Sequence, residues 1–211
     1  AFDGDADRVL CVDGNGEVVD GDMIMAILAL DMKARGTLKN NTVVGTIMSN
    51  LGFIRFCEAN DIRFSATKVG DRYVLEKMLA DGFVLGGEQS GHVILLDHNT
   101  TGDGLVTAVQ VISAMVKAQR PLSRLSSVMQ IMPQSQYAAN VSDSRKYDFD
   151  KNEKIMAMIR QLEEKYKDKG RLVIRASGTE PRVRVMIEGP DQREMDRDVY
   201  TLSKLIEREL M

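Results

Sequence analysis

The sequence predicts an α/β protein in which helices pack on a mixed sheet, followed by a smaller C-terminal α+β domain. Short β-branched runs alternate with helical segments over residues 20–132, and this alternation is typical of α/β layers with mostly parallel strands. From Pro133 the order becomes strand, helix, strand, strand, helix, which indicates a small α+β layer. Hydrophobic residues make up 44% and charged residues 28% of the 211 residues, a composition typical of folded globular chains.

Local patterns define the elements of the first part. Asp20 and Asp71 are expected to cap helices that end at Gly36 and Gly82. A strand, a Gly-Asn-Gly turn and a second strand are expected over 9–19. The further strands are expected at 42–47, 62–66, 83–85 and 93–96. The helices are expected at 20–35, 51–60, 71–80 and 102–117.

The second part has its own set of elements after the linker Pro133-Gln134-Ser135. Strands are expected at 136–141, 171–175 and 183–188, and helices at 150–167 and 191–210. We therefore predict three domain segments. They are 1–19 as the tail of one domain, 20–132 as a complete α/β domain and 133–211 as the α+β domain.

Charge and cysteine usage exclude several functional classes. The formal net charge of −3 gives no basic field that would favour nucleic acid. The longest apolar run, 23–30, is too short to span a bilayer, so no membrane insertion is expected. Cys11 and Cys57 lack metal-type spacing and no signal peptide is visible, so both are expected to be reduced core residues of a cytoplasmic protein.

Three aspartates near the start have the spacing of a metal-binding loop. Asp3, Asp5 and Asp7 lie at i, i+2 and i+4, separated by small residues, so their carboxylates can converge. Such a cluster needs a hard divalent cation such as Mg²⁺, unless it is only a solvated acidic turn. An EF-hand loop is excluded, because Arg8 and Gly14 stand where that loop needs glycine and glutamate.

A glycine-rich loop at 86–92 follows a predicted strand. Its glycines allow a ligand to approach the backbone closely, and Glu88 and Ser90 suit sugar hydroxyls. His92 is a candidate proton shuttle, although a turn with a satisfied histidine explains the residue equally well. The other histidine, His98, lies in a polar loop and is expected to be solvated.

Two further loops carry groups that suit anions. The segment 175–184 joins two strands, and its hydroxyls, backbone N–H groups and arginines form a candidate phosphate nest; the alternative is a solvated charged hairpin turn. The nest residues are Arg175, Ser177, Gly178, Thr179 and Arg184. The segment 68–72 joins a strand to a helix, whose start can bind a phosphate or sugar. Its candidate residues are Lys68, Gly70, Asp71 and Arg72, with Asp71 as a plain helix cap being the alternative.

Together and in this order, the aspartate loop, residues 68–74, 86–92, 100–104 and 175–181 resemble the α-D-phosphohexomutase superfamily. Within it the chain looks most similar to the bacterial phosphoglucosamine mutases, whose four domains surround a cleft. The resemblance implies that the chain comprises the end of the second domain and all of the third and fourth.

The resemblance also implies site roles. Mg²⁺ would be held by Asp3, Asp5 and Asp7, and Arg8, Lys68 and His92 would be catalytic, with His92 as acid/base. The remaining candidates would bind the substrate. They are Gly70, Asp71, Arg72, Glu88, Ser90, Arg175, Ser177, Gly178, Thr179 and Arg184.

In this family a phosphoserine donates its phosphoryl group to glucosamine 6-phosphate, and the bisphosphate returns the other phosphate to give glucosamine 1-phosphate. The product feeds UDP-N-acetylglucosamine and peptidoglycan precursors. Glucosamine or glucose 1,6-bisphosphate would be the intermediate or activator. A homodimer and a diadenylate cyclase partner are also implied.

Several departures from the family pattern shape the expectations. The chain opens on Ala1 without an initiator Met and has no serine in the phosphoserine context, so we expect part of a longer enzyme, inactive by itself. Ala6 and Ala176 replace the family's usual glycine and proline, and a left-handed backbone at either would be strained. The alternatives are a phosphomannomutase/phosphoglucomutase and a non-catalytic sugar-phosphate or metal-binding module.

Overall fold

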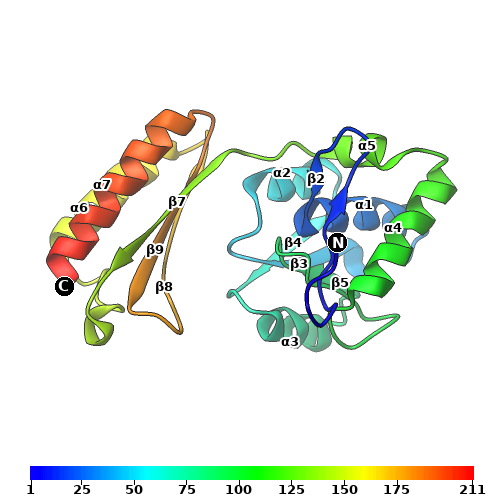
Figure 1. Cartoon of the computed structure of the whole chain (residues 1–211), viewed down its shortest axis with the longest axis horizontal. Helices are drawn as coiled ribbons and strands as arrows, with labels where there is room; N and C mark the ends of the chain where they lie inside the picture. The colour runs from blue at the N-terminus through cyan, green and yellow to red at the C-terminus, as the bar shows by residue number, and fades with distance from the viewer. The chain divides into compact units, whose positions relative to one another are not determined.

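The computed structural model describes all residues, 1–211, and divides into two compact units, Ala1–Ile131 and Met132–Met211 (Figure 1). Each unit has a hydrophobic core of its own. The first is a mixed sheet with helices packed on it and the second an antiparallel sheet with two helices, so the predicted fold class is confirmed. Residues 1–19 group with the first unit, and their assignment to a separate domain stays a prediction.

The first unit is built on a four-stranded sheet of order β4-β3-β5-β6. The strands are β3 (Thr42–Thr46), β4 (Arg63–Thr67), β5 (Leu85–Gly87) and β6 (Val93–Leu95). The central strand β3 runs parallel to β4 and β5, whereas β6 runs antiparallel to β5. Five residues connect β5 to β6, and a connection this short allows only an antiparallel pair.

Helices surround this sheet. They are α1 (Gly21–Ala34), α2 (Leu51–Ala59), α3 (Asp71–Asp81), α4 (Gly104–Ala118) and the short α5 (Leu122–Leu125). Asp20, Asn50 and Asp103 cap α1, α2 and α4 by accepting backbone N–H groups. The predicted cap of α3 is wrong: Gly70 is the N-cap, and Asp71 is the first helical residue. The predicted start of α4 at 102 is also two residues early, because the Asp103 carboxylate caps the helix there.

A small ribbon leads into α1. Its strands β1 (Cys11–Val12) and β2 (Val18–Val19) pair antiparallel. Cys57 on α2 is fully buried, and burial raises the pKa of its thiol to about 12. Cys11 is half-buried on the ribbon and packs against the edge of the core rather than lying inside it. Both thiols are free.

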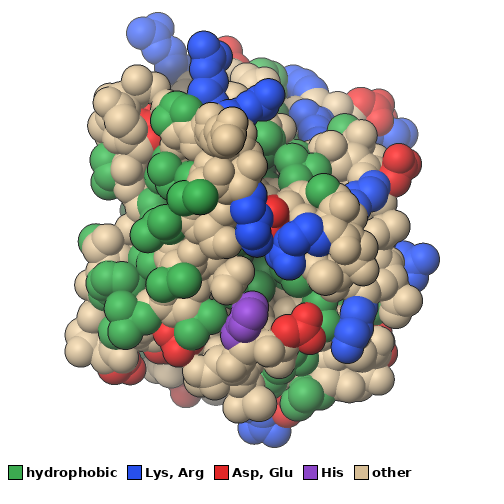
Figure 2. All heavy atoms as spheres, turned by 90° about the vertical axis from the view of Figure 1, so that its right-hand side faces the viewer, with side chains coloured by type: hydrophobic (Ala, Val, Ile, Leu, Met, Phe, Trp, Pro, Cys, Tyr) green, Lys and Arg blue, Asp and Glu red, His purple; other side chains and the backbone are tan.

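One side of α4 exposes an apolar stripe. Leu105, Val109, Ile112 and Val116 follow the helical repeat and are each more than half exposed. Figure 2 shows hydrophobic side chains gathered on the face of this unit that α4 covers. The opposite side of the helix packs Val111 and Ala114 into the core, so α4 is apolar on both sides.

The second unit is a three-stranded antiparallel sheet of order β7-β9-β8. Its strands are β7 (Gln134–Asn140), β8 (Arg171–Ala176) and β9 (Arg182–Glu188), and its helices are α6 (Glu153–Tyr166) and α7 (Gln192–Leu210). Both helices cover one face, because alternate residues of β9 (Val183, Val185 and Ile187) join their apolar sides in one core. Short 3₁₀ turns occupy Lys39–Asn41, Ser126–Val128 and Asp143–Arg145. None of the helices combines the length and apolarity needed to cross a bilayer.

Candidate functional site

The aspartate loop brings its three carboxylates together. One ligand oxygen from each of Asp3, Asp5 and Asp7 lies within 4.8 Å of the others. The loop is closed by the backbone N–H of Ala6, which donates to the Asp3 carbonyl at 3.3 Å, and Ala6 has a φ of 59°. The predicted left-handed strain is therefore present at Ala6, whereas Ala176 lies in strand β8 without a positive φ.

The donor set of this loop fits a hard divalent cation. Arg8 is the only nearby cation, and its Nε lies 3.8 Å from Asp3 Oδ2 and 3.7 Å from Asp7 Oδ1. Oδ1 of Asp7 is buried and has no hydrogen-bond partner. A buried carboxylate oxygen without a partner is costly unless a cation binds it. Three carboxylates balanced by one half-exposed arginine leave a net negative charge for Mg²⁺.

The aspartate loop is fastened to two other segments of the first unit. Val9 donates its backbone N–H to the Gly91 carbonyl at 3.1 Å, and His92 Nδ1 lies 3.0 Å from Asp7 Oδ2. From the other side, the backbone N–H of Gly104 at the start of α4 donates to the Ala6 carbonyl at 2.9 Å. The structure thus gathers the predicted aspartate and glutamate loops, together with residues 100–104, at one place.

The glutamate loop also meets the predicted segment 68–72. The backbone N–H of Gly70 donates to Glu88 Oε1 at 3.0 Å, across the carboxyl ends of two strands of the sheet. Gly70 has a φ of 128°, a backbone conformation that favours glycine. Lys68 lies 6.0 Å from the centre of the Tyr73 ring, and Arg72 pairs with its own helix through Glu76 at 2.7 Å. The side chain of Arg72 therefore lies along its own helix, α3.

A hollow of about 240 Å³ opens beside these groups. Asp3, Arg8 and Ser90 are among the residues that line it, so an acidic, a basic and a hydroxyl-bearing residue border one space. His92 does not reach this surface, because its side chain is only 3% exposed. The site therefore presents oxygen ligands and one cation to a bound molecule, while the imidazole lies beneath them.

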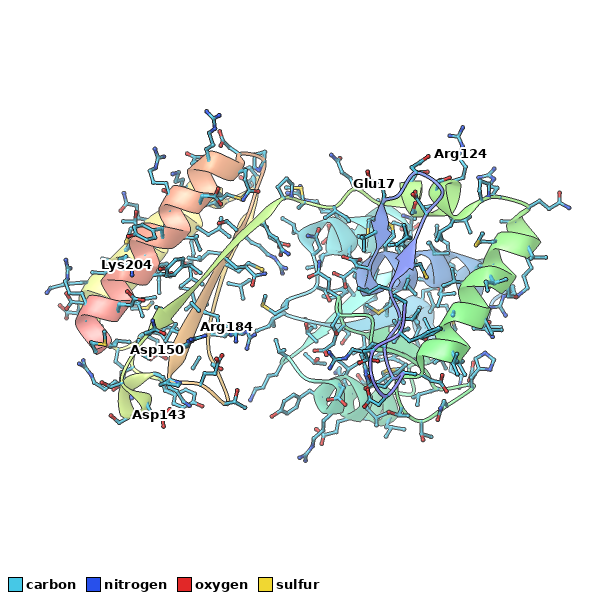
Figure 3. All side chains as sticks on the ribbon, viewed as in Figure 1. Glu17, Arg124, Asp143, Asp150, Arg184 and Lys204 are labelled. Atoms are coloured by element: carbon cyan, nitrogen blue, oxygen red, sulfur yellow. The ribbon has the colours of Figure 1, made fainter.

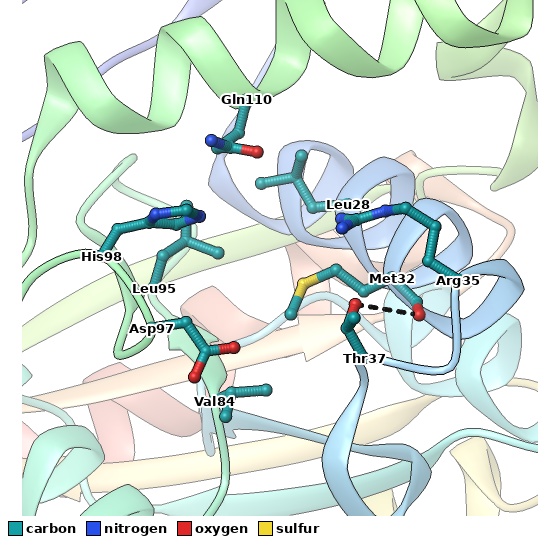
Figure 4. A pocket seen from close by; sticks show the side chains of 9 residues that line it. All are labelled: Leu28, Met32, Arg35, Thr37, Val84, Leu95, Asp97, His98 and Gln110. Carbon is teal, nitrogen blue, oxygen red and sulfur yellow. Dashed lines mark hydrogen bonds between the residues drawn. The ribbon is translucent and has the colours of Figure 1, made fainter.

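His98 belongs to a different place in the first unit. It is exposed, as predicted, and lines a cavity of about 130 Å³ with Asp97, Arg35 and Gln110 (Figure 4). Leu95 at the end of β6 forms part of this wall, at the opposite end of that strand from His92. This cavity is therefore separate from the aspartate site.

In the second unit, the predicted phosphate nest lies at the end of the β8–β9 hairpin. Arg175 and Arg184 stand directly opposite each other in the ladder. Figure 3 shows Arg184 on the side of β9 that is turned away from the two helices. Ser177 is only 4% exposed and its hydroxyl accepts the backbone N–H of Glu180 at 3.3 Å, whereas Gly178 and Thr179 are exposed.

Sequence reasoning missed Glu180 in this loop. Its carboxylate accepts from Arg184 Nη2 at 2.7 Å and from Arg182 Nη1 at 3.1 Å. Glu180, Arg182 and Arg184 alternate along the chain, and this spacing places side chains on one face of an extended segment. This alternation is the sequence pattern from which Glu180 could have been identified as a partner of the two arginines.

Sequence reasoning also missed Asp22 in the first unit. This carboxylate is fully buried, and its Oδ2 accepts the backbone N–H of Asn50 at 2.6 Å. It holds the junction between β3 and α2 at the carboxyl end of the sheet. An aspartate within the otherwise apolar start of α1 was the only signal in the sequence.

Two family models match the chain. Residues 20–132 match the phosphoglucomutase/phosphomannomutase alpha/beta/alpha domain III, and residues 138–199 match the C-terminal domain of the same family. The chain is 52% identical over 210 residues to the phosphoglucosamine mutase of Acetivibrio thermocellus, covering 100% of this chain and 47% of that protein. The phosphoglucosamine mutase of Ruminiclostridium cellulolyticum is also 52% identical, with the same coverage. The chain thus spans about half the length of these relatives.

Solved structures share the fold. The N-acetylphosphoglucosamine mutase of Aspergillus fumigatus, in complex with GlcNAc-6P and magnesium, aligns with a TM-score of 0.81 and 20% identity. The alignment covers 100% of this chain and 48% of that one.

Proposed function

Because the chain belongs to the phosphoglucomutase/phosphomannomutase family, we propose that it is the metal-binding and sugar-phosphate-binding half of a phosphoglucosamine mutase. The observation that carries this proposal is the convergence of three carboxylates, within 4.8 Å, beside the glutamate loop. The 52% identity to phosphoglucosamine mutases favours an amino sugar over glucose or mannose as the substrate.

Each group of the first unit has a chemical task in this proposal. Asp3, Asp5 and Asp7 hold Mg²⁺, which when bound would neutralise charge on the phosphoryl group in transfer. The Arg8 guanidinium, half-exposed beside them, stabilises the same phosphoryl oxygens. Ser90 offers its hydroxyl to the sugar from the shared hollow.

The remaining groups of the first unit orient the substrate. Glu88 uses one carboxylate oxygen to hold Gly70 and keeps the other for a sugar hydroxyl. Lys68 is exposed and offers a compact cation at the start of α3. Asp71 begins that helix, so the first turn combines a carboxylate with free backbone N–H groups.

The second unit supplies the cradle for the phosphate that is not transferred. Arg175 and Arg184 face each other across the ladder, and the exposed Gly178 and Thr179 offer a backbone N–H and a hydroxyl. Forked guanidinium groups and N–H donors recognise a phosphate dianion in any of several orientations. Such a cradle suits a sugar bisphosphate intermediate, because either of its two phosphates must be able to bind there.

In the proposed reaction, a phosphoserine outside these 211 residues transfers its phosphoryl group to glucosamine 6-phosphate. The bisphosphate then returns the other phosphoryl group to the serine and leaves glucosamine 1-phosphate. Ser49 and the other serines of this chain lie in different contexts. We therefore expect no mutase turnover from the chain alone, and turnover in a coupled assay would overturn this expectation.

A substrate panel tests the proposal on the full-length protein. With Mg²⁺ present, glucosamine 6-phosphate should give the highest kcat/KM, above glucose and mannose phosphates. A preference for mannose or glucose phosphate would instead indicate a phosphomannomutase/phosphoglucomutase. No conversion of any of the three would favour a non-catalytic binding module.

The metal site has a separate test. Mn²⁺ binding to the 211-residue chain, measured by electron paramagnetic resonance, should fall at least tenfold in Asp5→Asn, because one anionic ligand is lost. Asp13→Asn, which removes the same charge from the nearby turn, should leave Mn²⁺ binding unchanged. Equal affinity in both variants would overturn the metal assignment.

The wider context follows from the same family. We place the reaction in the cytoplasm, in the supply of UDP-N-acetylglucosamine for peptidoglycan. Glucosamine or glucose 1,6-bisphosphate would act as intermediate and activator. The A. fumigatus enzyme, which has the same fold, has been solved in complex with magnesium and in complex with glucose 1,6-bisphosphate, and these structures support both ligands. The homodimer and the diadenylate cyclase partner stay predictions.

A further inference from the structure

Gln89 stands in the glutamate loop (residues 86–92) between Glu88 and Ser90, the two residues to which the proposed function gives the sugar. Its side chain is half-buried, and its Nε2 donates at 3.1 Å to Oδ2 of Asp20, which lies 69 positions away in the chain. An ionised carboxylate can only accept hydrogen bonds, so this contact decides which edge of the Gln89 amide faces Asp20. The side chain of Gln89 is therefore anchored on the start of α1.

The backbone of Gln89 is held at the same place. Gly21, the first residue of α1, donates its N–H to the Gln89 carbonyl at 3.0 Å. A Cβ at residue 21 would lie 2.0 Å from the Glu88 carbonyl oxygen and 2.8 Å from the Gly91 nitrogen, so only glycine allows the loop to lie this close to the helix. Gln89 is thus tied to α1 through both its side chain and its main chain.

Asp20 divides its two carboxylate oxygens between the helix and the loop. Oδ1 accepts the backbone N–H of Met23 at 3.0 Å and so caps α1, while Oδ2 accepts from Gln89. Ile24 and Met25, in the first turns of α1, are fully buried in the core of the first unit. The carboxylate that holds Gln89 is therefore fixed on a helix that the core holds in place.

Glu88 is consequently held from two sides. Its Oε1 accepts the backbone N–H of Gly70 at 3.0 Å, and its own N–H donates to the His92 carbonyl at 3.0 Å. The next residue along the chain is Gln89, which is tied to Asp20. A side chain whose surroundings are fixed in advance loses less conformational entropy when it binds a ligand. The direction of the second Glu88 oxygen thus depends on the anchor at Gly70 and on the anchor at Asp20.

We propose that Gln89 is a positioning residue, which together with Asp20 orients the glutamate loop so that Glu88 and Ser90 face the sugar. This inference rests on the proposed function, because the ligand of the loop is the phosphosugar substrate. Preorganisation of a loop lowers the free-energy cost of binding the substrate. Its loss weakens the binding of ground state and transition state alike, so it should appear in KM rather than in kcat.

An exchange of groups between the two residues tests the pair in the full-length protein. Gln89→Glu sets a second carboxylate against Asp20 and should raise KM for glucosamine 6-phosphate about tenfold at saturating Mg²⁺, with kcat within about twofold of wild type. Addition of Asp20→Asn should return KM to near the wild-type value, because the new amide still caps α1 and can donate to the new carboxylate. This double variant carries the wild-type net charge.

Three further variants complete the test. Asp20→Asn alone should keep a nearly wild-type KM, since the Gln89 amide can rotate and offer its oxygen. Gln110→Glu adds the same charge to another half-buried glutamine of the first unit, in the separate cavity beside His98, and should leave KM unchanged. If Gln89→Glu does not fold, as judged by circular dichroism, Gln89→Ala removes the donor without adding charge and should raise KM in the same direction.

The outcomes separate this inference from the proposed function. A wild-type KM in folded Gln89→Glu or Gln89→Ala would overturn the inference, while turnover by the wild-type protein would leave the proposed function standing. An equally raised KM in Gln89→Glu and in the double variant would exclude Asp20 as the partner. A lower kcat at unchanged KM would show a structural role alone. Absence of phosphosugar turnover in the wild-type full-length protein would overturn the proposed function, and this inference with it.

Discussion

Gly104 donates its backbone N–H to the carbonyl of Ala6 at 2.9 Å and so fastens the aspartate loop to the first turn of α4. The carbonyl faces the helix because Ala6 adopts a left-handed backbone, with a φ of 59°. For a residue with a Cβ, steric repulsion makes this conformation less favourable by about 1–2 kcal/mol. The loop that gathers the three aspartates is therefore strained at its centre.

Replacing Ala6 by glycine should relieve this strain. We expect Ala6→Gly to raise the free energy of unfolding of the first unit by about 1 kcal/mol, because the relief exceeds the entropic cost of glycine in the unfolded chain. Ala176→Gly is the matched control: this residue lies in strand β8, so glycine there should destabilise by about 0.5–1 kcal/mol. Urea unfolding measures both, and destabilisation by Ala6→Gly would contradict the strain.

The Asp103 cap makes the stability of the first unit depend on pH. Its carboxylate accepts the Val106 N–H at 2.9 Å and the Asn99 amide at 3.0 Å. The Val106 hydrogen bond lowers the pKa of Asp103 below its usual value. A carboxyl group whose pKa is lower in the folded state stabilises the fold above its unfolded pKa of about 3.9, and this contribution disappears as pH falls through the folded pKa.

Substitution of the cap tests this dependence. At pH 7, Asp103→Ala should lower the free energy of unfolding by about 1 kcal/mol, as for other helix caps, and Asp103→Asn by less, since its amide oxygen still accepts. The difference between wild type and Asp103→Asn should shrink as the pH falls below about 4. Urea titrations between pH 3 and 7 measure it. A constant difference over this range would contradict the role of the charge.

The hydrophobic clusters of the two units share no residue, so core damage should remain within one unit. Leu202 on α7 is fully buried in the second unit, and Leu85 on β5 is fully buried in the first. Leu202→Ala should cost about 2–5 kcal/mol. It should reduce amide hydrogen-exchange protection only in 132–211, and Leu85→Ala should do so only in 1–131. Loss of protection in both units from either variant would show that they unfold as one.

Glu180 pairs with Arg184 of the proposed phosphate cradle and with the neighbouring Arg182, so it should compete with phosphate. Glu180→Gln should tighten binding of inorganic phosphate about two- to fivefold, since an exposed ion pair is worth about 0.2–1 kcal/mol. Glu164→Gln removes an exposed glutamate charge from α6 and should leave phosphate affinity unchanged. Isothermal titration calorimetry measures both. Weaker phosphate binding in Glu180→Gln would mean that this carboxylate supports the cradle instead.

Local chemistry explains which elements were predictable from the sequence. The cap at Asp20, the left-handed Gly82 at the end of α3 and the β-branched strand β3 depend on neighbours within a few residues. The sequence predictions were wrong where a contact with a residue distant in the chain overrode a local rule. Asp71 follows every rule for a helix cap, but Gly70 takes that position with its N–H bound to Glu88, 18 residues away.

The sequence by itself determined the order of helices and strands and the division near residue 132, and it supplied the candidate metal and phosphate ligands, because periodicity, capping and charge are local features of the chain. Only the tertiary structure decided how those residues are used. Folding buries the His92 ring beside Asp7, and it pairs Glu180 with Arg182 and Arg184. Such pairings depend on which distant side chains the fold brings within hydrogen-bond distance. The spacing of residues along the chain does not specify these contacts.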